Sequence, residues 1–247
     1  MYESLYQKVT SDNYDVAICN YVQESNGVIK EIRIQTNKYI LSREDIVKWL
    51  IPNLIGPKDL NSNSSRIMGS VCRLLIKKEL IEKKQLLFQP EIPLMEDLIW
   101  CIKLFTNTNN VIIDEGSYYH YVNNEGSAVN VYRENMKELQ KKVLKEIEET
   151  LIKGRLYEIS KERLEIRYVR MIINSLANEA HKGNSKSLKK KLQAVKCLCR
   201  DDELKNILKS IDTKNYTFRK RTILYTIKKE WSVYIYTYYT VFNKIVK

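Results

Sequence analysis

The stretch FQPEIPLMEDLIWCIKLF, residues 88–105, places two adjacent acids, Glu96 and Asp97, between a proline-punctuated lead-in and a strongly apolar run. When residues 97–106 are wound as a helix, apolar side chains cover most of its sides, which is typical of a helix buried in a core. Acids in the first turn of a helix interact favourably with the helix dipole. The stretch therefore predicts a core helix with two carboxylates at its N-terminus, which either cap the helix or serve a site at its mouth.

Strands and helices are interspersed over the first 133 residues, on both sides of this helix. Ser42 and Asp45 have the spacing of a capping box, and Pro52 is expected to end the helix that they open. Strands are predicted at residues 16–19, 27–35, 71–76, 111–113 and 118–122, and further helices at residues 1–12 and 77–84. The interspersed strands and helices therefore predict an α/β fold class.

The pattern becomes helical after residue 133. Apolar residues recur three and four positions apart, and Gly154 and Gly183 mark breaks. We predict a first domain at residues 1–133, a mostly α-helical region at residues 134–212 and a basic, aromatic amphipathic helix at residues 213–247.

The composition limits the classes of partner and the compartment. The chain of 247 residues carries a formal charge of +12, which favours an anionic partner such as nucleic acid, nucleotide phosphates or an acidic membrane surface. The five cysteines are scattered, as expected of reduced cytoplasmic thiols, and no CxxC pair accompanies Cys197 and Cys199 to complete a zinc site. No signal peptide and no membrane-spanning run is visible. We expect a cytoplasmic protein, soluble or peripherally attached to a membrane.

The sequence contains no P-loop, GxGxxG, HExxH, GxSxG or paired CxxC motif. An ordered series of short elements is present instead. It consists of RLLIKKELI (residues 73–81), Phe88, the Glu96-Asp97-Leu98 triplet, DEGSYYHY (114–121), NEGS (124–127) and Tyr132-Arg133. In this order and spacing the series resembles family 2 glycosyltransferases of the GT-A fold. The resemblance covers about the first 133 residues and implies an incomplete GT-A-like mixed sheet.

The resemblance implies transfer of a sugar from a nucleotide-diphospho-sugar to a glycan or lipid-linked acceptor hydroxyl, with inversion. Inverting transfer needs a base that takes the proton of the attacking hydroxyl. The family assigns this role to the aspartate of the acidic pair, hence Asp97, and Glu96 would orient it or touch the acceptor. The structural alternative is that both acids only stabilise the N-terminus of a core helix.

Three further residues fall at donor-side positions of the family: His120, Ser127 and Arg133. If residues 118–122 form a strand, His120 shares a face with Tyr118, and Tyr119 and Tyr121 share the other. His120 is either near the diphosphate or a partly buried strand histidine. Ser127 and Arg133 lie where the family closes a loop over the donor, and an arginine suits a diphosphate. A surface salt bridge is the alternative for Arg133.

The sequence departs from the family in lacking the nucleotide-binding half and its DxD motif. That motif holds the divalent ion, Mn or Mg, that the full-length family uses, so no metal ligand is identified here. The chain is expected to be N-terminally truncated, a piece of a split enzyme or a degenerate homologue, and to be inactive alone.

The segment from residue 214 to the end has eight Lys or Arg against one acid, Glu230, interleaved with aromatic residues. One helical face would comprise Leu224, Ile227, Trp231, Tyr234, Ile235, Tyr238, Phe242 and Ile245. Such a helix suits an anionic membrane surface, which for polysaccharide biosynthesis at the cell envelope would be the inner face of the plasma membrane. Docking on the helical region is the structural alternative, and binding of single-stranded nucleic acid is the non-enzymatic one.

Overall fold

The computed structural model describes residues 1–25, 27–61, 67, 69–122, 131–214 and 216–245. The first part contains α1 (Tyr2–Ser11), β1 (Val16–Ser25), β2 (Val28–Ile32), β3 (Ile40–Leu41), α2 (Arg43–Asp45), α3 (Ile51–Ile55), β4 (Leu74–Ile76), α4 (Lys78–Lys84), α5 (Glu96–Thr106) and β5 (Val111–Val122). The second contains α6 (Met136–Lys153), α7 (Tyr157–Glu179), α8 (Leu188–Cys199), α9 (Asp202–Ser210), α10 (Phe218–Lys228) and α11 (Ser232–Ile245). The α/β fold class followed by a helical part is confirmed.

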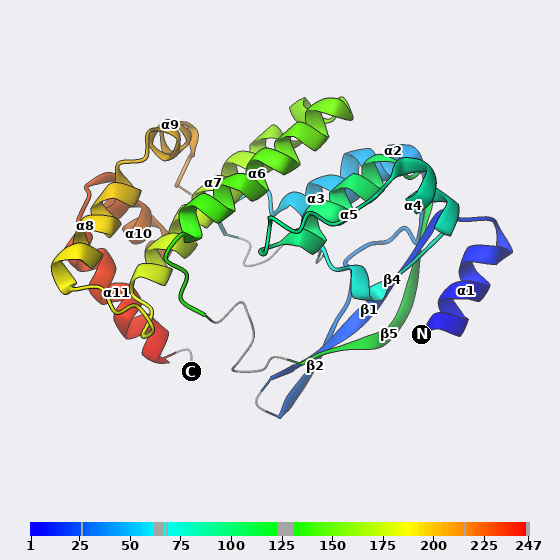
Figure 1. Ribbon diagram of the computed structural model, residues 1–247, viewed down its shortest axis with the longest axis horizontal. Helices are drawn as coiled ribbons and strands as arrows, with labels where there is room; N and C mark the ends of the chain where they lie inside the picture. Colours follow the sequence, from blue (N-terminus) through cyan, green and yellow to red (C-terminus); the bar gives the residue numbers. More distant parts are fainter. Residues whose placement is uncertain (26, 62–66, 68, 123–130, 215, 246–247) are drawn as a thin grey trace.

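The strands form one mixed sheet with the order β2-β1-β5-β3, and β4 also pairs with β1. The central pair, β1 and β5, is parallel, and the other pairs are antiparallel. Helix α1 lies on one side of the sheet, and α2, α3 and α5 lie on the other (Figure 1). The sheet is therefore a platform whose two faces meet different helices.

Alternation along β1 and β5 supplies side chains to both faces. Val16 and Ile18 pack with α3 and α5 in the larger core, while Ala17 and Cys19 pack with α1 in a smaller one. Helix α5 is buried over most of its length, as the apolar run predicts. This burial fixes the position of the acids in its first turn.

Strand β5 is continuous, so the prediction of two separate strands in this segment is wrong. The sequence Asp114-Glu115-Gly116 looks like a turn, but the Gly116 N–H donates to Asp114 Oδ1 at 2.7 Å while the strand runs on. A side chain at Gly116 would lie 2.1 Å from the Tyr118 ring, which folds back over it. The pairing of β5 with β1 is irregular at this segment, because its register shifts on either side of Asn20 in β1.

Three other predictions need correction. The Ser42–Asp45 capping box is confirmed, but Pro52 does not end the helix that it opens. A π-helical turn, Ile46–Leu50, lies before Pro52, and α3 continues after Pro52 to Ile55. The segment predicted as strand at residues 71–76 begins with a 3₁₀ turn, Val71–Arg73, before β4. The tail forms two helices, because the chain turns at Glu230, whose φ is 56°.

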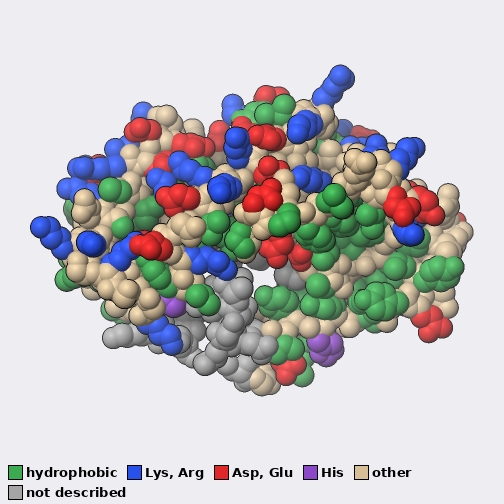
Figure 2. Space-filling model, in the orientation of Figure 1, with side chains coloured by type: hydrophobic (Ala, Val, Ile, Leu, Met, Phe, Trp, Pro, Cys, Tyr) green, Lys and Arg blue, Asp and Glu red, His purple; other side chains and the backbone are tan. Residues whose placement is uncertain are grey.

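A second hydrophobic core lies in the helical part and is built by α7 to α11. The long helices α6 and α7 run between this part and the sheet (Figure 1). On the face drawn in Figure 2, charged side chains of both signs are intermixed over the helices, and hydrophobic side chains gather toward the sheet and α1. The net charge of +12 therefore does not form one basic patch on this face.

Candidate functional site

The acidic pair opens α5, and its backbone is set by the residue before it. Met95 has φ 57° and ψ 26°, a left-handed conformation that turns the chain into the helix, and no side chain caps this end. The first helical bond runs from the Ile99 N–H to the Met95 carbonyl at 3.2 Å. Glu96 is exposed and Asp97 is half-buried, so the two acids lie in different environments on one helix turn.

The carboxylate of Asp97 interacts with the chain that passes in front of α5. Its Oδ2 accepts a hydrogen bond from the Val71 N–H at 3.4 Å. Partial burial is the largest influence and raises the pKa of Asp97 above its ordinary value. The Val71 N–H acts in the opposite direction, and the charge of Glu96 adds to the rise. Asp97 is thus a stronger base than a solvated aspartate.

Gly69 lets this passing segment lie close to α5. A Cβ at position 69 would stand 2.7 Å from Leu98 Cδ1 and 3.0 Å from Leu98 Cα. Real side chains do not reach such distances, so only glycine permits the approach. The contact keeps Val71 against the first turn of α5 and so positions the Asp97 carboxylate.

Tyrosines of the sheet lie beside Asp97. Tyr119 is paired with Tyr21 of β1 in the parallel register, and strand alternation places Tyr121 on the same face. The pKa of Tyr119 is raised, first by a hydrogen bond with the Cys72 side chain and then by burial, and the negative charge of Asp97 adds to this. Tyr119 of β5 thus interacts with Cys72 of the 3₁₀ turn, and the charge of Asp97 on α5 also acts on it.

Arg73 lies beneath this group and is only 1% exposed. Its Nη1 donates to the Cys19 carbonyl at 3.2 Å, and its guanidinium lies 5.6 Å from the centroid of the Tyr21 ring. Below Asp97 on α5, burial raises the pKa of Cys101 to about 12, so this thiol is neutral. Arg73 is thus a buried cation held against Tyr21, and Cys101 is an uncharged thiol on the same helix as Asp97.

Sequence reasoning did not select Tyr119, Cys72 or Arg73 as site residues. A signal was available for two of them. Arg73 begins the basic segment RLLIKKELI, and the alternation in YYHY already separated Tyr119 from His120. Only the tertiary structure reveals that Tyr119 interacts with Cys72 and that Arg73 lies against Tyr21.

Of the three predicted donor-side residues, the structure describes His120 and Arg133, and it places them on different segments from Asp97. The exposed His120 alternates with Tyr119 in the regularly paired end of β5, so their side chains lie on opposite faces of the sheet. Arg133 is held at α7, where its N–H donates to Asn178 Oδ1 at 3.0 Å and its carbonyl accepts from Asn178 Nδ2 at 2.8 Å. Ser127 lies outside the described residues.

The full-length family uses a divalent ion, Mn or Mg, which needs several oxygen ligands grouped together. No group of three or more His, Cys, Asp or Glu side chains that could hold an ion occurs among the described residues. Glu96 and Asp97 offer one exposed and one half-buried carboxylate with no third acidic, histidine or thiolate ligand grouped with them. Within the described part of the chain, these two residues do not fit a Mn or Mg site.

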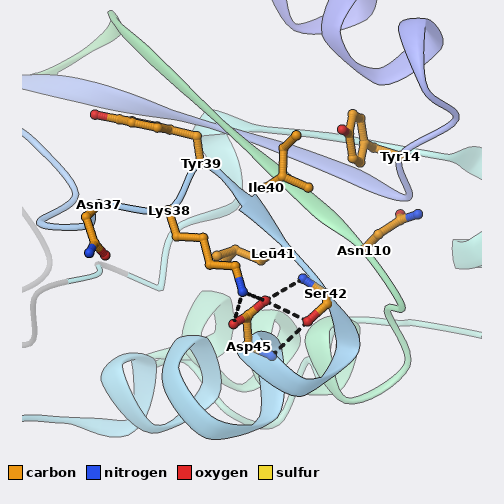
Figure 3. A pocket seen from close by; sticks show the side chains of 9 residues that line it. All are labelled: Tyr14, Asn37, Lys38, Tyr39, Ile40, Leu41, Ser42, Asp45 and Asn110. Atoms are coloured by element: carbon orange, nitrogen blue, oxygen red, sulfur yellow. Dashed lines mark hydrogen bonds and ion pairs between the residues drawn. The ribbon is translucent and has the colours of Figure 1, made fainter.

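A wide hollow of about 710 Å³ lies elsewhere, at the β3 edge of the sheet. Figure 3 shows Lys38 and Asp45 pointing toward one another on one side of it, and Lys38 Nζ lies 2.5 and 2.6 Å from the two Asp45 oxygens. This ion pair, with Ser42, lowers the pKa of Asp45 to about 2. Asp97 does not line the hollow. The charged residues that do line it, Lys38 and Asp45, are paired with each other.

Comparison with known proteins supports the fold. No protein-family model and no curated protein sequence matches the chain. The solved structure of Staphylococcus aureus TarS, residues 1–349 in complex with UDP-GlcNAc, is similar with a TM-score of 0.52 and 12% identity, over 99% of this chain and 64% of that one. The UDP complex of the same protein gives a TM-score of 0.48 and 11% identity, over 99% and 62%.

At 12% identity, the likeness to TarS is one of fold. The chain spans less than two thirds of the length of the TarS chains that it matches. It has a partial glycosyltransferase-like α/β fold, extended by helices. Within the described residues, no helix is both long enough and apolar enough to cross a bilayer.

Proposed function

We propose that the protein is a glycosyltransferase of family 2 type, which transfers a sugar from a nucleotide-diphospho-sugar to a hydroxyl of a glycan or lipid-linked acceptor. The observation that carries the proposal is Asp97. It is a half-buried carboxylate with a raised pKa, held by the Val71 N–H at the start of a rigid helix, in a glycosyltransferase-like fold. A capping role alone does not explain it, because the carboxylate accepts from a neighbouring segment.

Asp97 would act as the general base. Its carboxylate takes the proton of the acceptor hydroxyl while the hydroxyl oxygen bonds to the anomeric carbon. The bond from that carbon to the diphosphate oxygen breaks on the opposite face, which inverts the configuration. The nucleoside diphosphate leaves with the electron pair. A raised pKa suits this step, because a base is most effective when its pKa approaches the working pH.

Neighbouring residues would bind and orient the acceptor. Glu96, exposed one residue earlier, is placed to accept a hydrogen bond from a second acceptor hydroxyl. The Tyr119 hydroxyl, whose pKa the charge of Asp97 helps to raise, would donate a hydrogen bond to the same acceptor. Arg73 would not touch the acceptor, since it is buried, but it fixes the Tyr21 ring behind the site.

Donor binding is the second part of the proposal. The similar TarS structure was solved in complex with UDP-GlcNAc, and we propose that the donor here is also a nucleotide-diphospho-sugar. His120, Ser127 and Arg133 remain proposed donor-side residues. A divalent ion, if one is used, would need ligands beyond the described residues. We propose that a second polypeptide segment supplies them, and that the chain alone transfers sugar poorly.

Sugar transfer is tested on material that preserves any such partner. The tagged chain is purified from the cells that make it, and transfer from labelled nucleotide-diphospho-sugars to glycan and lipid-linked acceptors is measured. Asp97→Asn should lower the transfer rate by about 10²- to 10⁴-fold, the usual contribution of a general base. Glu79 is an exposed acid of α4, and Glu79→Gln is the matched control, which should leave the transfer rate unchanged. Transfer by Asp97→Asn at the wild-type rate would remove Asp97 as the base.

A further inference from the structure

Helices α10 and α11 form an antiparallel hairpin at the end of the chain. Arg219 Nε donates to the Tyr238 hydroxyl at 2.5 Å near one end, and Tyr225 meets Trp231 at the other. Leu224, Ile227 and Ile235 are 2%, 1% and 0% exposed and belong to the core of the helical part. The apolar stripe expected to face a membrane is thus directed inward over much of its length.

The opposite side of the hairpin exposes aromatic residues. Phe218 is 83% exposed, Tyr225 and Trp231 are each 51% exposed, and Tyr234 is 45% exposed. On α10, Phe218 and Tyr225 are seven residues apart and therefore share a face. The rings of Tyr225 and Trp231 meet edge to face at 5.6 Å, which joins this face to the start of α11.

Basic side chains accompany these aromatics. Lys229 Nζ lies 5.8 Å from the centroid of the Tyr225 ring, and Arg221 is exposed one turn after Phe218. Helix α10 contains no acid, and Glu230 is held by Arg200 at 2.6 Å and Lys205 at 3.6 Å. We call the set Phe218, Arg221, Tyr225, Lys229, Trp231 and Tyr234 the hairpin surface.

We propose that the hairpin surface docks the protein on an anionic phospholipid bilayer. Exposed Phe, Trp and Tyr side chains match the depth of the headgroup region, where an apolar ring can be buried and a polar edge can stay hydrated. Arg221 and Lys229 then meet lipid phosphates and anionic headgroups. The contact needs no spanning helix. It does not depend on the proposed sugar transfer, because none of its residues belongs to the Asp97 site.

The arrangement of the rings favours a bilayer over single-stranded nucleic acid. Stacking platforms for bases present open aromatic faces along a groove. Here Tyr225 and Trp231 are perpendicular, with an interplanar angle of 88°, and Lys229 covers the Tyr225 ring. Phe218, at the first position of α10, is also the most exposed large hydrophobic side chain among the described residues.

Vesicle co-sedimentation of the full chain tests the proposal. The probes are vesicles of phosphatidylglycerol and phosphatidylcholine (about 3:7) and vesicles of phosphatidylcholine alone, because anionic lipid supplies the electrostatic attraction. The wild-type chain should bind the vesicles that contain phosphatidylglycerol at least about ten-fold more tightly than the vesicles of phosphatidylcholine alone. The double variants Phe218→Ser/Trp231→Ser and Arg221→Glu/Lys229→Glu should each lose at least about ten-fold in affinity.

Matched controls separate the hairpin surface from general basicity. Tyr2→Ser/Tyr6→Ser removes two aromatics of α1 that are 68% and 64% exposed, and Lys83→Glu/Lys84→Glu reverses two exposed charges of α4. Both should bind vesicles like the wild type, with circular dichroism confirming that every variant is folded. Equal losses in hairpin and control variants, or unchanged binding by the hairpin variants, would overturn the proposal. So would retention on single-stranded DNA without vesicle binding.

Discussion

Asp97 is a residue whose environment works against its charge. Partial burial raises its pKa, so the folded protein holds the proton more tightly than the unfolded chain, whose aspartate pKa is near 3.8. The free energy of unfolding must then fall as pH rises from this value through the raised pKa. At neutral pH the ionised Asp97 is a destabilising group, which is a common property of functional residues.

Asp97→Asn should therefore be more stable than the wild type at pH 7. The asparagine oxygen can still accept from the Val71 N–H but carries no charge to desolvate. Urea unfolding at several pH values measures the difference, which should shrink as pH falls toward 3.8. A variant less stable than wild type at pH 7, with Glu79→Gln unchanged, would show that Asp97 serves stability.

Gly69 is the second residue on which the geometry at Asp97 depends. Gly69→Ala places a methyl group 2.7 Å from Leu98 Cδ1. Either the segment from Gly69 to Val71 or helix α5 must then move. We expect a loss of about 1–3 kcal/mol in the free energy of unfolding, as for overpacking elsewhere, together with lower sugar transfer. Gly56→Ala is the control, because its new Cβ meets nothing closer than 3.9 Å.

At the scale of elements, α9 is organised by one buried acid. Asp201 Oδ1 accepts from the Leu204 N–H at 3.0 Å as the helix N-cap and from the Tyr168 hydroxyl at 2.7 Å. Lys137 and Lys141 lie 2.9 and 3.2 Å from Oδ2. Burial alone would raise the pKa of Asp201, but these hydrogen bonds together hold it well below the usual range.

Asp201→Ala should lower the free energy of unfolding by about 2 kcal/mol, since it removes an N-cap and a buried acceptor. The depressed pKa stabilises the fold above the unfolded value of 3.8, and this contribution is lost as pH falls below it. Thermal unfolding at pH 7 and pH 3 measures both effects. Asp202→Ala, in the next and exposed position, should have little effect. Equal effects of the two substitutions would contradict the role of Asp201.

The elements that sequence patterns predicted well are those with strong periodicity. Helix α5 begins within one residue of the expected start, and the Ser42–Asp45 capping box is present. The failures have tertiary causes. Tyr118 folding over Gly116 lets β5 pass a turn-like sequence, and the turn at Glu230 breaks an apparently continuous amphipathic helix. No local pattern could show that Tyr119 interacts with Cys72, because the contact joins distant segments.

At the scale of the whole molecule, the two parts are connected by shared cores. Val143, Ile147 and Leu151 of α6 are 0% exposed and complete the core that contains α5 and the sheet. Arg167 of α7 donates to the Ile55 carbonyl at 2.5 Å and to Met95 Sδ at 2.9 Å, directly before the acidic pair. The helical part thus supports the candidate site, and the boundary predicted near residue 133 stays a prediction.

Residues 1–133 expressed alone should not fold cooperatively, because removal of α6 exposes the buried face of α5. Circular dichroism during urea titration, compared with the full chain, measures this. A sharp unfolding transition for the shorter chain would contradict the shared core and would support an independent first domain.

The most direct measurement of the central claim, that Asp97 is the general base, is the pH dependence of sugar transfer by the partner-containing preparation. The wild-type kcat/KM should rise with pH through an apparent pKa above 3.8 and then level off, and Glu79→Gln should show the same acidic limb. Asp97→Asn should retain donor binding, lose about 10²- to 10⁴-fold in rate and lack that limb. An unchanged limb in Asp97→Asn would contradict the claim.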